Sequence, residues 1–246
     1  MLLYVVTTMR LTQTILAPDQ QAQDEKRLLA SLPEVLRLRG LVERNDWHQD
    51  DPFQQSLRLF RWVRSLPALL LEALATPGTT FLTSVVDPSN GHRTVQELLA
   101  FVALIHDVGK AETFCLMPDG TTRCPDHEAV GARMAPAICA RFGFTPAETR
   151  FVTELVGAHG EPYALFKEIA PLPIPQQQER MSRFEAEHAG HLLPLLLLAW
   201  GDLVTSQLQS ICPEKYEAVL DFYRRWLQHV WPREERGGGK EPEAQR

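Results

Sequence analysis

The chain has 246 residues, 44% of them hydrophobic, and its formal net charge is −6 at pH 7. That length and hydrophobic content suffice for one domain with a substantial core. The negative charge argues against a protein whose main role is to grip a nucleic-acid backbone, although nucleic acid stays possible as a partner. The four cysteines contain no CxxC pair, which argues against a thiolate zinc site and favours a reducing, cytoplasmic location.

The two ends of the chain differ in composition from the middle. The start, "MLLYVVTTMR", lacks a basic region and a cleavage site, so we expect no signal peptide. The longest apolar run, "HLLPLLLLAW", is too short to cross a bilayer and contains proline, so we expect no membrane span. The last stretch, "REERGGGKEPEAQR", is typical of a disordered tail. We therefore predict an N-terminal segment over 1–18, one helical domain over 19–232 and a tail over 233–246.

Helical periodicity dominates the first half of the chain. "DEKRLLASLPEVLRLRGLV" has apolar residues at helical spacing, with a break near Pro33. "DPFQQSLRLFRWVRSL" opens with Asp51 and then proline at the first helical position, a common start signal. Its apolar stripe consists of Phe53, Leu57, Phe60 and Val63. These patterns predict helices that bury one face each.

The central segment combines a helix and a hairpin. "TVQELLAFVALIHD" begins with a capping box formed by Thr94 and Glu97, and Gly109 is expected to end this helix in a left-handed conformation. "TFCLMPDGTTRC", residues 113–124, predicts a β-hairpin that turns at Asp119 and Gly120.

The sequence pattern of the second half of the chain also predicts helices. "DHEAVGARMAPAICARF" predicts a helix capped by Asp126, and "TPAETRFVTELVGA" carries a second capping box, Thr145 with Glu148. Two long helices are expected around 192–208 and 214–230. The predicted fold class is therefore all-α, a helical bundle with a minor β-hairpin.

One helix ends on two adjacent side chains that can bind metal. In "ALIHDVGKAET" an apolar run finishes at His106 and Asp107, followed by Gly109 and Lys110. Neighbouring helical residues point about 100° apart, so one ion beside the helix can be reached by both. The alternative is a solvated aspartate and a histidine stabilised by the helix dipole, which is the commoner case for such a pair alone.

Three further residues offer ligand chemistry. His127 lies at a predicted helix start, His159 at a helix end, and Asp202 within "LLLLAWGDLVTSQ". A bare carboxylate among leucines is costly unless it is paired or bound to metal. Taken singly, each histidine is more often structural, and Asp202 could instead pair with a buried arginine or a helix N-terminus.

Together these residues resemble the HD-domain metal-dependent phosphohydrolase superfamily, whose ligand order is H…HD…H…H…D. "LIHDVGKAET", "TFCLMPDGTTRCPDHEAVGARMA" and "TELVGAHG" look like the HD region of bacterial CCA-adding tRNA nucleotidyltransferases and their stand-alone relatives. The resemblance covers roughly residues 50–207, and it implies an HD-type helical bundle.

The resemblance also implies roles for the ligand residues. His106, Asp107 and Asp202 would hold one divalent metal ion. Asp107 would bridge to a second ion held by His127 and His159. The family pattern leaves open whether one or two ions bind, and which of Mn, Fe, Co, Ni, Zn or Mg they are.

Several basic residues near the motif could meet the substrate. The resemblance places Lys110 on a substrate phosphate, where it would act with Asp107 in catalysis. The alternative for Lys110 is a solvent-facing lysine after a helix end. Arg123 and Arg133 are further candidates for substrate binding, with plain surface roles as their alternative.

This chain departs from the family at its first ligand. The family places a histidine in a D-x-x-x-H-[TS]-L stretch, and the matching stretch here, "DPFQQSL", has Gln55. An amide is a much poorer ligand for a transition metal than imidazole. The resemblance would therefore leave Gln55 or water in the vacant place on the first metal ion, and we expect Gln55 to point into the same cavity as the dyad. His48 and His92 fall off the pattern but are the places to seek a substitute. His188 and His191 have i,i+3 spacing and could chelate metal, but they show no third ligand.

The implied function is a phosphohydrolase acting through metal-bound hydroxide on a phosphate ester, either a small-molecule nucleotide or a phosphorylated nucleic-acid end. The alternative is a degenerate HD module that binds nucleotide or metal without turnover, which Gln55 favours. Retention of the other ligands favours the enzyme, because drift after loss of activity would erode several of them. A helical interaction scaffold would leave Asp202 unexplained.

Overall fold

The structure is a computed structural model that describes residues 21–45, 47, 51–66, 79–84, 86, 91 and 93–231. The segment expected over 1–18 and the tail expected over 233–246 lie outside these residues. Within the described part of the chain, no helix has the length and apolar character needed to cross a membrane.

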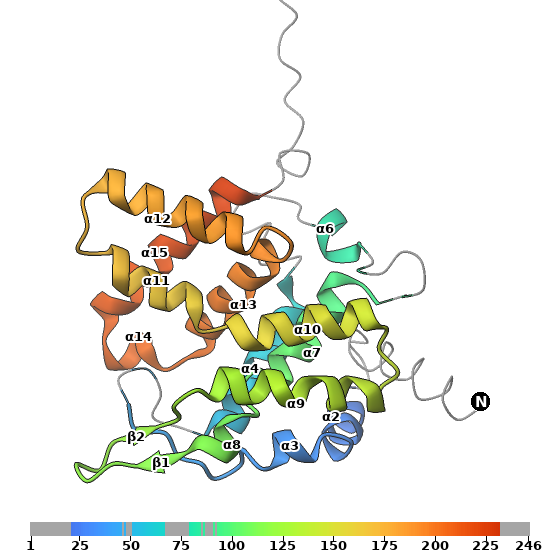
Figure 1. The fold of residues 1–246 in the computed structure, drawn as a ribbon. Coiled ribbons are helices and arrows are strands. Elements are labelled where there is room, and N and C mark those ends of the chain that lie inside the picture. The colour runs from blue at the N-terminus through green and yellow to red at the C-terminus, as the bar shows by residue number, and fades with distance from the viewer. Residues whose placement is uncertain are drawn as a thin grey trace, which may run out of the picture.

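Helices and one small hairpin make up the described fold (Figure 1). The elements are α2 (Gln21–Ala30), α3 (Pro33–Leu36), α4 (Pro52–Arg64), α6 (Thr79–Thr83), α7 (Val95–Ile105), α8 (Lys110–Thr113), β1 (Cys115–Leu116), β2 (Thr122–Arg123), α9 (His127–Arg141), α10 (Pro146–Ala158), α11 (Glu161–Ile169), α12 (Ile174–Glu187), α13 (Leu192–Thr205), α14 (Leu208–Ile211) and α15 (Pro213–Val230). The two strands are antiparallel, with Cys115 opposite Arg123. The predicted all-α class with a minor hairpin is confirmed.

The start signals in the sequence work as expected. Asp51 accepts a backbone N–H at the start of α4, next to the proline at the first helical position. Both predicted capping boxes form, Thr94 with Glu97 on α7 and Thr145 with Glu148 on α10. Each box satisfies N–H groups that a helix start otherwise leaves unpaired, so the first turns of these two helices are firmly placed.

The core is organised around α7, whose residues are all buried from Val95 to Ile105. α4 packs against α7 along its predicted apolar stripe, and α10 and α13 also contact α7. α9 packs mainly on α10, as Figure 1 shows for these neighbouring helices. The His-Asp dyad follows the last residue of α7 and is buried with it, His106 being 1% and Asp107 2% exposed.

Two predicted helix ends are wrong in detail. Gly109 has right-handed helical backbone angles, φ −63° and ψ −23°, because the chain continues through a turn directly into α8. Asp126 does precede α9, but its side chain makes no capping hydrogen bond and its backbone is left-handed at φ 53°. In both places tertiary packing, rather than a local capping motif, sets the backbone.

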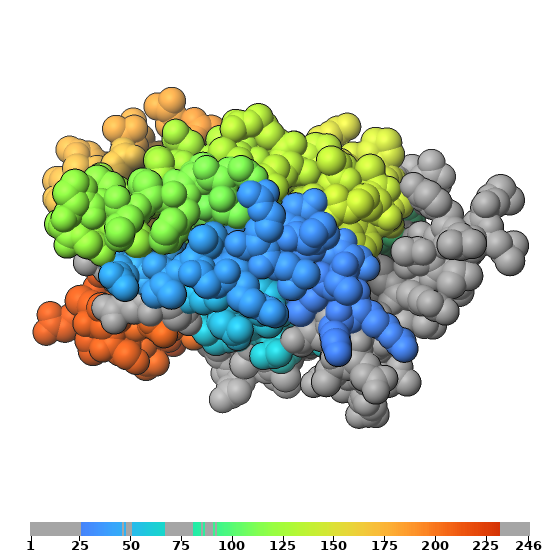
Figure 2. All heavy atoms as spheres, turned by 90° about the horizontal axis from the view of Figure 1, so that it is seen from below, coloured from blue at the N-terminus to red at the C-terminus, as the bar shows by residue number. Residues whose placement is uncertain are grey.

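The N-terminal residues form one face of the molecule. Figure 2 shows the described part of 25–45, in blue, lying between α9, in green, and α4, in cyan. The loop after α3 is joined to the hairpin, since Arg44 N–H donates to Thr122 Oγ1 at 2.7 Å and accepts at its carbonyl from Thr122 N–H at 3.2 Å. These bonds hold the neighbouring Glu43 beside the end of α7.

Candidate metal centre

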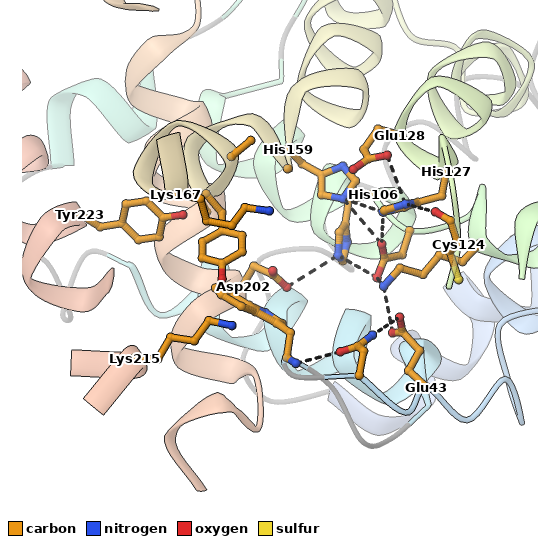
Figure 3. Close-up of a pocket in the computed structure, with 18 residues that line it drawn as sticks. Glu43, His106, Cys124, His127, Glu128, His159, Lys167, Asp202, Lys215 and Tyr223 are labelled. Carbon is orange, nitrogen blue, oxygen red and sulfur yellow. Dashed lines mark hydrogen bonds and ion pairs between the residues drawn. The ribbon is translucent and has the colours of Figure 1, made fainter. Parts of the chain in front are cut away.

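The five predicted ligands come from four helices and line one pocket of about 580 Å³ (Figure 3). His106 and Asp107 follow the last residue of α7, and His127 is the first residue of α9. His159 caps the end of α10, and Asp202 lies on α13. The fold therefore brings together residues that are up to about a hundred positions apart in sequence.

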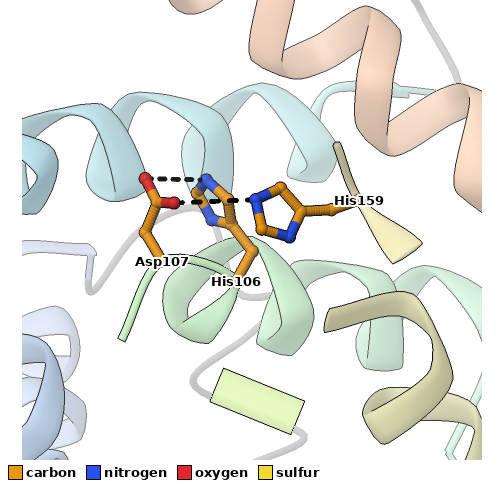
Figure 4. A group of neighbouring side chains, drawn as sticks. All are labelled: His106, Asp107 and His159. Atoms are coloured by element: carbon orange, nitrogen blue, oxygen red, sulfur yellow. Dashed lines mark ion pairs between the residues drawn. The ribbon is translucent and has the colours of Figure 1, made fainter. Parts of the chain in front are cut away.

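Asp107 lies at the centre of three imidazole rings. Its Oδ2 is 3.2 Å from His106 Nε2, and its Oδ1 is 3.3 Å from His127 Nε2 and 3.6 Å from His159 Nε2. The Nε2 atoms of His127 and His159 are 3.3 Å apart. Figure 4 shows His106 and His159 turned toward this carboxylate from different helices. All these atoms surround one small volume.

The three rings are oriented in the same way. Each Nδ1 contacts the backbone carbonyl three residues earlier, and these carbonyls belong to Ala103, Cys124 and Val156 at 3.0, 2.9 and 2.8 Å. A carbonyl oxygen can only accept, so each Nδ1 must carry the proton. In the neutral rings Nε2 then presents its lone pair to the centre. Histidines that bind metal typically hold their second nitrogen this way.

Two overlapping groups of side chains have spacing that suits an ion. In the first, ligand atoms of His106, Asp107 and His159 all lie within 4.8 Å of one another. In the second, the same holds for His127, Glu128 and His159. Ligand bonds of about 2.0–2.2 Å allow separations up to about 4.4 Å, so each group needs little or no adjustment to close on one ion. These groups are drawn from the described residues alone.

Glu128 is a member of the second group that our reading of the sequence missed. It follows His127 in α9, and its Oε2 lies 3.2 Å from His127 Nδ1. Gly160 leaves room for it, because a Cβ there would lie 2.8 Å from Glu128 Oε1. The adjacent "HE" pair at a helix start was the available signal, since carboxylates often accompany metal-binding histidines.

Asp202 belongs to neither group. Its Oδ1 is 3.9 Å from His106 Nε2, and its side chain is 23% exposed on the pocket. The side chain is therefore partly exposed on the pocket rather than enclosed by the leucines of α13. Asp202 instead stands at the pocket wall and accepts a hydrogen bond from Gln55 at 2.9 Å.

Gln55 is fully buried and lies behind Asp202. Its Nε2 donates to Asp202 Oδ1, to the Asp202 carbonyl at 3.2 Å and to Thr205 Oγ1 at 3.1 Å. Its Oε1 accepts from Arg58 Nη2 at 2.7 Å. Gln55 is not among the residues that line the pocket, so its amide does not face the cavity as expected. Its Nε2 end positions Asp202, and its Oε1 end is held by Arg58.

Lys110 is buried and sits between two carboxylates. Its Nζ is 2.9 Å from Asp107 Oδ2 and 2.9 Å from Glu43 Oε2. The solvent-facing alternative for this lysine is therefore wrong. Glu43, itself only 4% exposed, carried no signal in the sequence, because it lies in an irregular loop 67 positions before its partner.

The charges of this cluster depend on one another. Burial opposes ionisation of Asp107, yet His106 and Lys110 hold its pKa well below the usual range. Burial lowers the pKa of His106 and His127, but Asp107 outweighs it and both pKa values are raised. Burial raises the pKa of Glu43 despite Lys110. Burial lowers the pKa of Lys110, but the carboxylates of Asp107 and Glu43 outweigh burial and raise this pKa above its usual value. Asp107 and Lys110 are thus kept charged.

Gly109 brings α9 to the end of α7. A Cβ at this position would lie 2.0 Å from the His127 carbonyl oxygen and 2.7 Å from Gly131 N. Both are backbone atoms that cannot move aside alone. The glycine of the "HDVGK" stretch is therefore required for the close approach that puts His127 against Asp107.

The remaining candidates lie away from the centre or outside the described residues. Arg123 and Arg133 are exposed, and neither is among the residues that line the pocket. His48 and His92 fall outside the described residues.

A second histidine pair lies elsewhere on the molecule. His188 Nδ1 and His191 Nε2 are 3.3 Å apart, and each ring also pairs with a glutamate, Glu161 at 3.0 Å and Glu154 at 3.4 Å. This pair does not line the pocket, so it provides an internal comparison for the candidate centre.

Comparison with known proteins finds a short likeness. No family model matches the chain. Over 63 residues it is 35% identical to the bifunctional uridylyltransferase/uridylyl-removing enzyme of Mycobacterium tuberculosis, in strains CDC 1551 / Oshkosh and ATCC 25618 / H37Rv. The match covers 26% of this chain and only 6% of each relative. A uridylyl group is a nucleotide joined through its phosphate, so the likeness is to proteins named for nucleotide chemistry.

Proposed function

We propose that this protein is a metal-dependent phosphohydrolase of the HD type, acting on a phosphate ester of the nucleotide class. The observation that carries the proposal is the convergence of His106, His127 and His159 on Asp107, with every Nδ1 committed to a backbone carbonyl. Three imidazole lone pairs and a carboxylate, in two overlapping groups, are the ligand set that a divalent cation requires.

The close pair of rings strengthens this argument. With both protons on Nδ1, neutral His127 and His159 would direct two lone pairs at each other across 3.3 Å. A cation among these atoms turns that repulsion into coordination. Imidazole with carboxylate suits Mn, Fe, Co, Ni or Zn, whereas Mg prefers oxygen ligands, so we expect a transition metal.

The bound ion would supply Lewis acidity and lower the pKa of a water molecule at the centre. The residues of this chain have separate tasks. Lys110 keeps Asp107 ionised and in place through a 2.9 Å contact to Oδ2. Gln55 holds Asp202 through Oδ1, which leaves Oδ2 as the atom that can accept a proton from the attacking water at the pocket wall.

The nucleotide class has independent support. The relatives found by comparison are named for a nucleotidyl group. A volume of about 580 Å³ falls in the range of small-ligand sites. The net charge of −6 disfavours a long polyanion, so a free nucleotide fits better than nucleic acid.

The proposal is tested by assaying phosphate release from a panel of nucleotides and phosphodiesters after reconstituting metal-depleted protein with single metals. We expect turnover with at least one transition metal, loss of it with chelator, and a fall of at least about a hundredfold in Asp107→Asn. Asp221→Asn, on the exposed side of α15, is the matched control and should match wild type. Metal and nucleotide binding without turnover would favour the non-catalytic module instead, and absence of both would refute the proposal.

A further inference from the structure

We propose that one wall of the pocket is a nucleotide-recognition surface, in which Trp47 and Tyr163 stack on the base while Lys167 and Lys215 bind a phosphate other than the one hydrolysed. We call these four residues the recognition wall. Figure 3 shows both lysines on the side of the pocket opposite His127 and Cys124. The inference rests on the proposed function, and it names the ligand that this site selects.

The aromatic half of the wall is a supported platform. The rings of Trp47 and Tyr163 are 4.3 Å apart between centroids and tilted by 54°. Tyr163 is backed by Phe166, stacked at 17° and 6.2 Å, and Phe166 in turn contacts Phe222. Trp47 and Tyr163 are both only partly buried and line the pocket. Such rings offer flat apolar faces on which a base of any identity can stack.

The cationic half lies over the same rings. Lys167 Nζ is 4.8 Å from the Tyr163 centroid, and Lys215 Nζ is 5.6 Å from Tyr163 and 5.9 Å from Trp47. In the part of the chain that the structure describes, no ion pair with a carboxylate involves either lysine. Two ammonium groups without counter-charges at a pocket that also offers a metal centre favour a ligand with more than one anionic group.

Lys110 cannot take over this role. Lys110 lies next to the dyad, but its Nζ already contacts Asp107 and Glu43, each at 2.9 Å. Its positive charge is balanced inside the protein, so it offers little to a substrate. Lys167 and Lys215 are therefore the pocket lysines that remain for phosphate.

The wall is assembled from three separate segments. Trp47 lies in the loop after α3, and Lys215 lies in the first turn of α15. Tyr163 and Lys167 are four residues apart on α11 and so share one helix face. Convergence of aromatic and basic side chains from distant segments on the mouth of one pocket is expected for a ligand site, not for scattered surface residues.

The ligand class follows from the two halves together. A base needs the rings, a phosphate at the metal centre needs the histidines, and a further phosphate needs the lysines. A nucleoside diphosphate or a nucleotide of similar charge meets all three requirements within about 580 Å³. A base-free phosphate ester would use only the metal centre.

The test measures equilibrium binding to the metal-loaded protein by calorimetry, with α,β-methylene-UDP and ribose 5-phosphate as probes. Tyr163→Leu should weaken binding of the uridine analogue at least about fivefold, because a stacked base is lost. Tyr163→Phe keeps the ring and should bind like wild type. Lys167→Met and Lys215→Met should each weaken it about three- to tenfold and reduce its salt dependence. Lys26→Met on α2, exposed, is the control and should change nothing, and ribose 5-phosphate should bind alike in all variants.

Unchanged binding of the uridine analogue in Tyr163→Leu would overturn the inference. So would an equal loss of ribose 5-phosphate binding in the variants, and so would failure of the analogue to bind wild type. Tighter binding of an octanucleotide than of the analogue would overturn the ligand class. The proposed function fails separately: if the variants lose binding as expected while wild type hydrolyses nothing, the wall stands and the hydrolase proposal falls. If wild type hydrolyses nucleotides while the variants bind the analogue as wild type does, the hydrolase proposal stands and the recognition wall falls.

Discussion

At the scale of single residues, the site is arranged around the buried carboxylate of Asp107. Its two oxygens meet His106 and Lys110 on one side and His127 and His159 on the other. Taking such a charge out of water is costly, and it is offset only by several close partners. The same partners fix the orientation of the Asp107 carboxylate, and a metal ligand also requires a fixed orientation.

Some of these residues could be predicted from the sequence and others could not. His106, Asp107 and the two later histidines could be found from their motifs, "LIHDVGKAET", "DHEAVG" and "TELVGAHG", although the capping signals expected at Gly109 and Asp126 did not form. Glu43 could not be found, because its partner Lys110 is distant in the chain and its loop has no periodicity. Whether Gln55 faces the pocket or supports Asp202 depends on the packing of α4 against α13, which no local pattern contains.

Gln55→His tests the departure from the family pattern. Gln55 lies behind Asp202, whose Oδ1 is 2.9 Å from Gln55 Nε2 and 3.9 Å from His106 Nε2, so an imidazole at position 55 would reach an ion only through the space between Asp202 and His106. We expect metal to bind about tenfold or more tightly, because imidazole is the better ligand. The measurement is a competition titration against a chelator, with Gln55→Leu as control. Equal metal affinity in Gln55→His and wild type would show that this position does not reach the ion.

At the scale of elements, the candidate ligands lie at helix ends. The ends of α7 and α10 carry His106 and His159, and the start of α9 carries His127. Capping boxes at the starts of α7 and α10 made these helices predictable from sequence. The approach of α9 was not predictable, because the role of Gly109 lies in a contact with a backbone carbonyl eighteen positions later.

Gly109→Ala should therefore separate α9 from the end of α7. The added Cβ would lie 2.0 Å from the His127 carbonyl, and we expect a loss of about 3 kcal/mol in the free energy of unfolding, at the upper end of overpacking costs. Metal affinity should fall with it. Gly157→Ala is the matched control, since its Cβ would meet only Ala132 Cβ at 3.4 Å, and it should change stability by about 1 kcal/mol or less. Denaturant unfolding of both variants decides this, and equal stabilities would contradict the packing argument.

At the scale of the whole molecule, the clustered charges make stability depend on pH when metal is removed. The pKa values of His106 and His127 are raised in the folded chain. Their contribution is present below about pH 6.5 and is lost as pH rises through the folded pKa values. The pKa of Asp107 is lowered, so its contribution is present above about pH 4 and is lost as pH falls.

The metal-free protein should consequently have its highest Tm between about pH 4 and 6.5, and its Tm should decline toward pH 8. Added metal should raise Tm most at pH 8, because deprotonated imidazoles bind it best. Calorimetric scans in chelator from pH 5 to 8 measure this. A His127→Ala, His159→Ala variant should show a flatter decline, and a wild-type Tm that rises steadily to pH 8 without metal would contradict the charge arrangement.

The central claim is that the histidines around Asp107 hold metal, and elemental analysis of purified protein tests it most directly. His127→Ala, His159→Ala is compared with His188→Ala, His191→Ala, which removes a pair with the same 3.3 Å ring-nitrogen separation outside the pocket. We predict one or two transition-metal ions per chain in wild type and in the His188/His191 variant, and at least one ion fewer in the His127/His159 variant. Unchanged metal content in the His127/His159 variant, or an equal loss in both, would contradict the account.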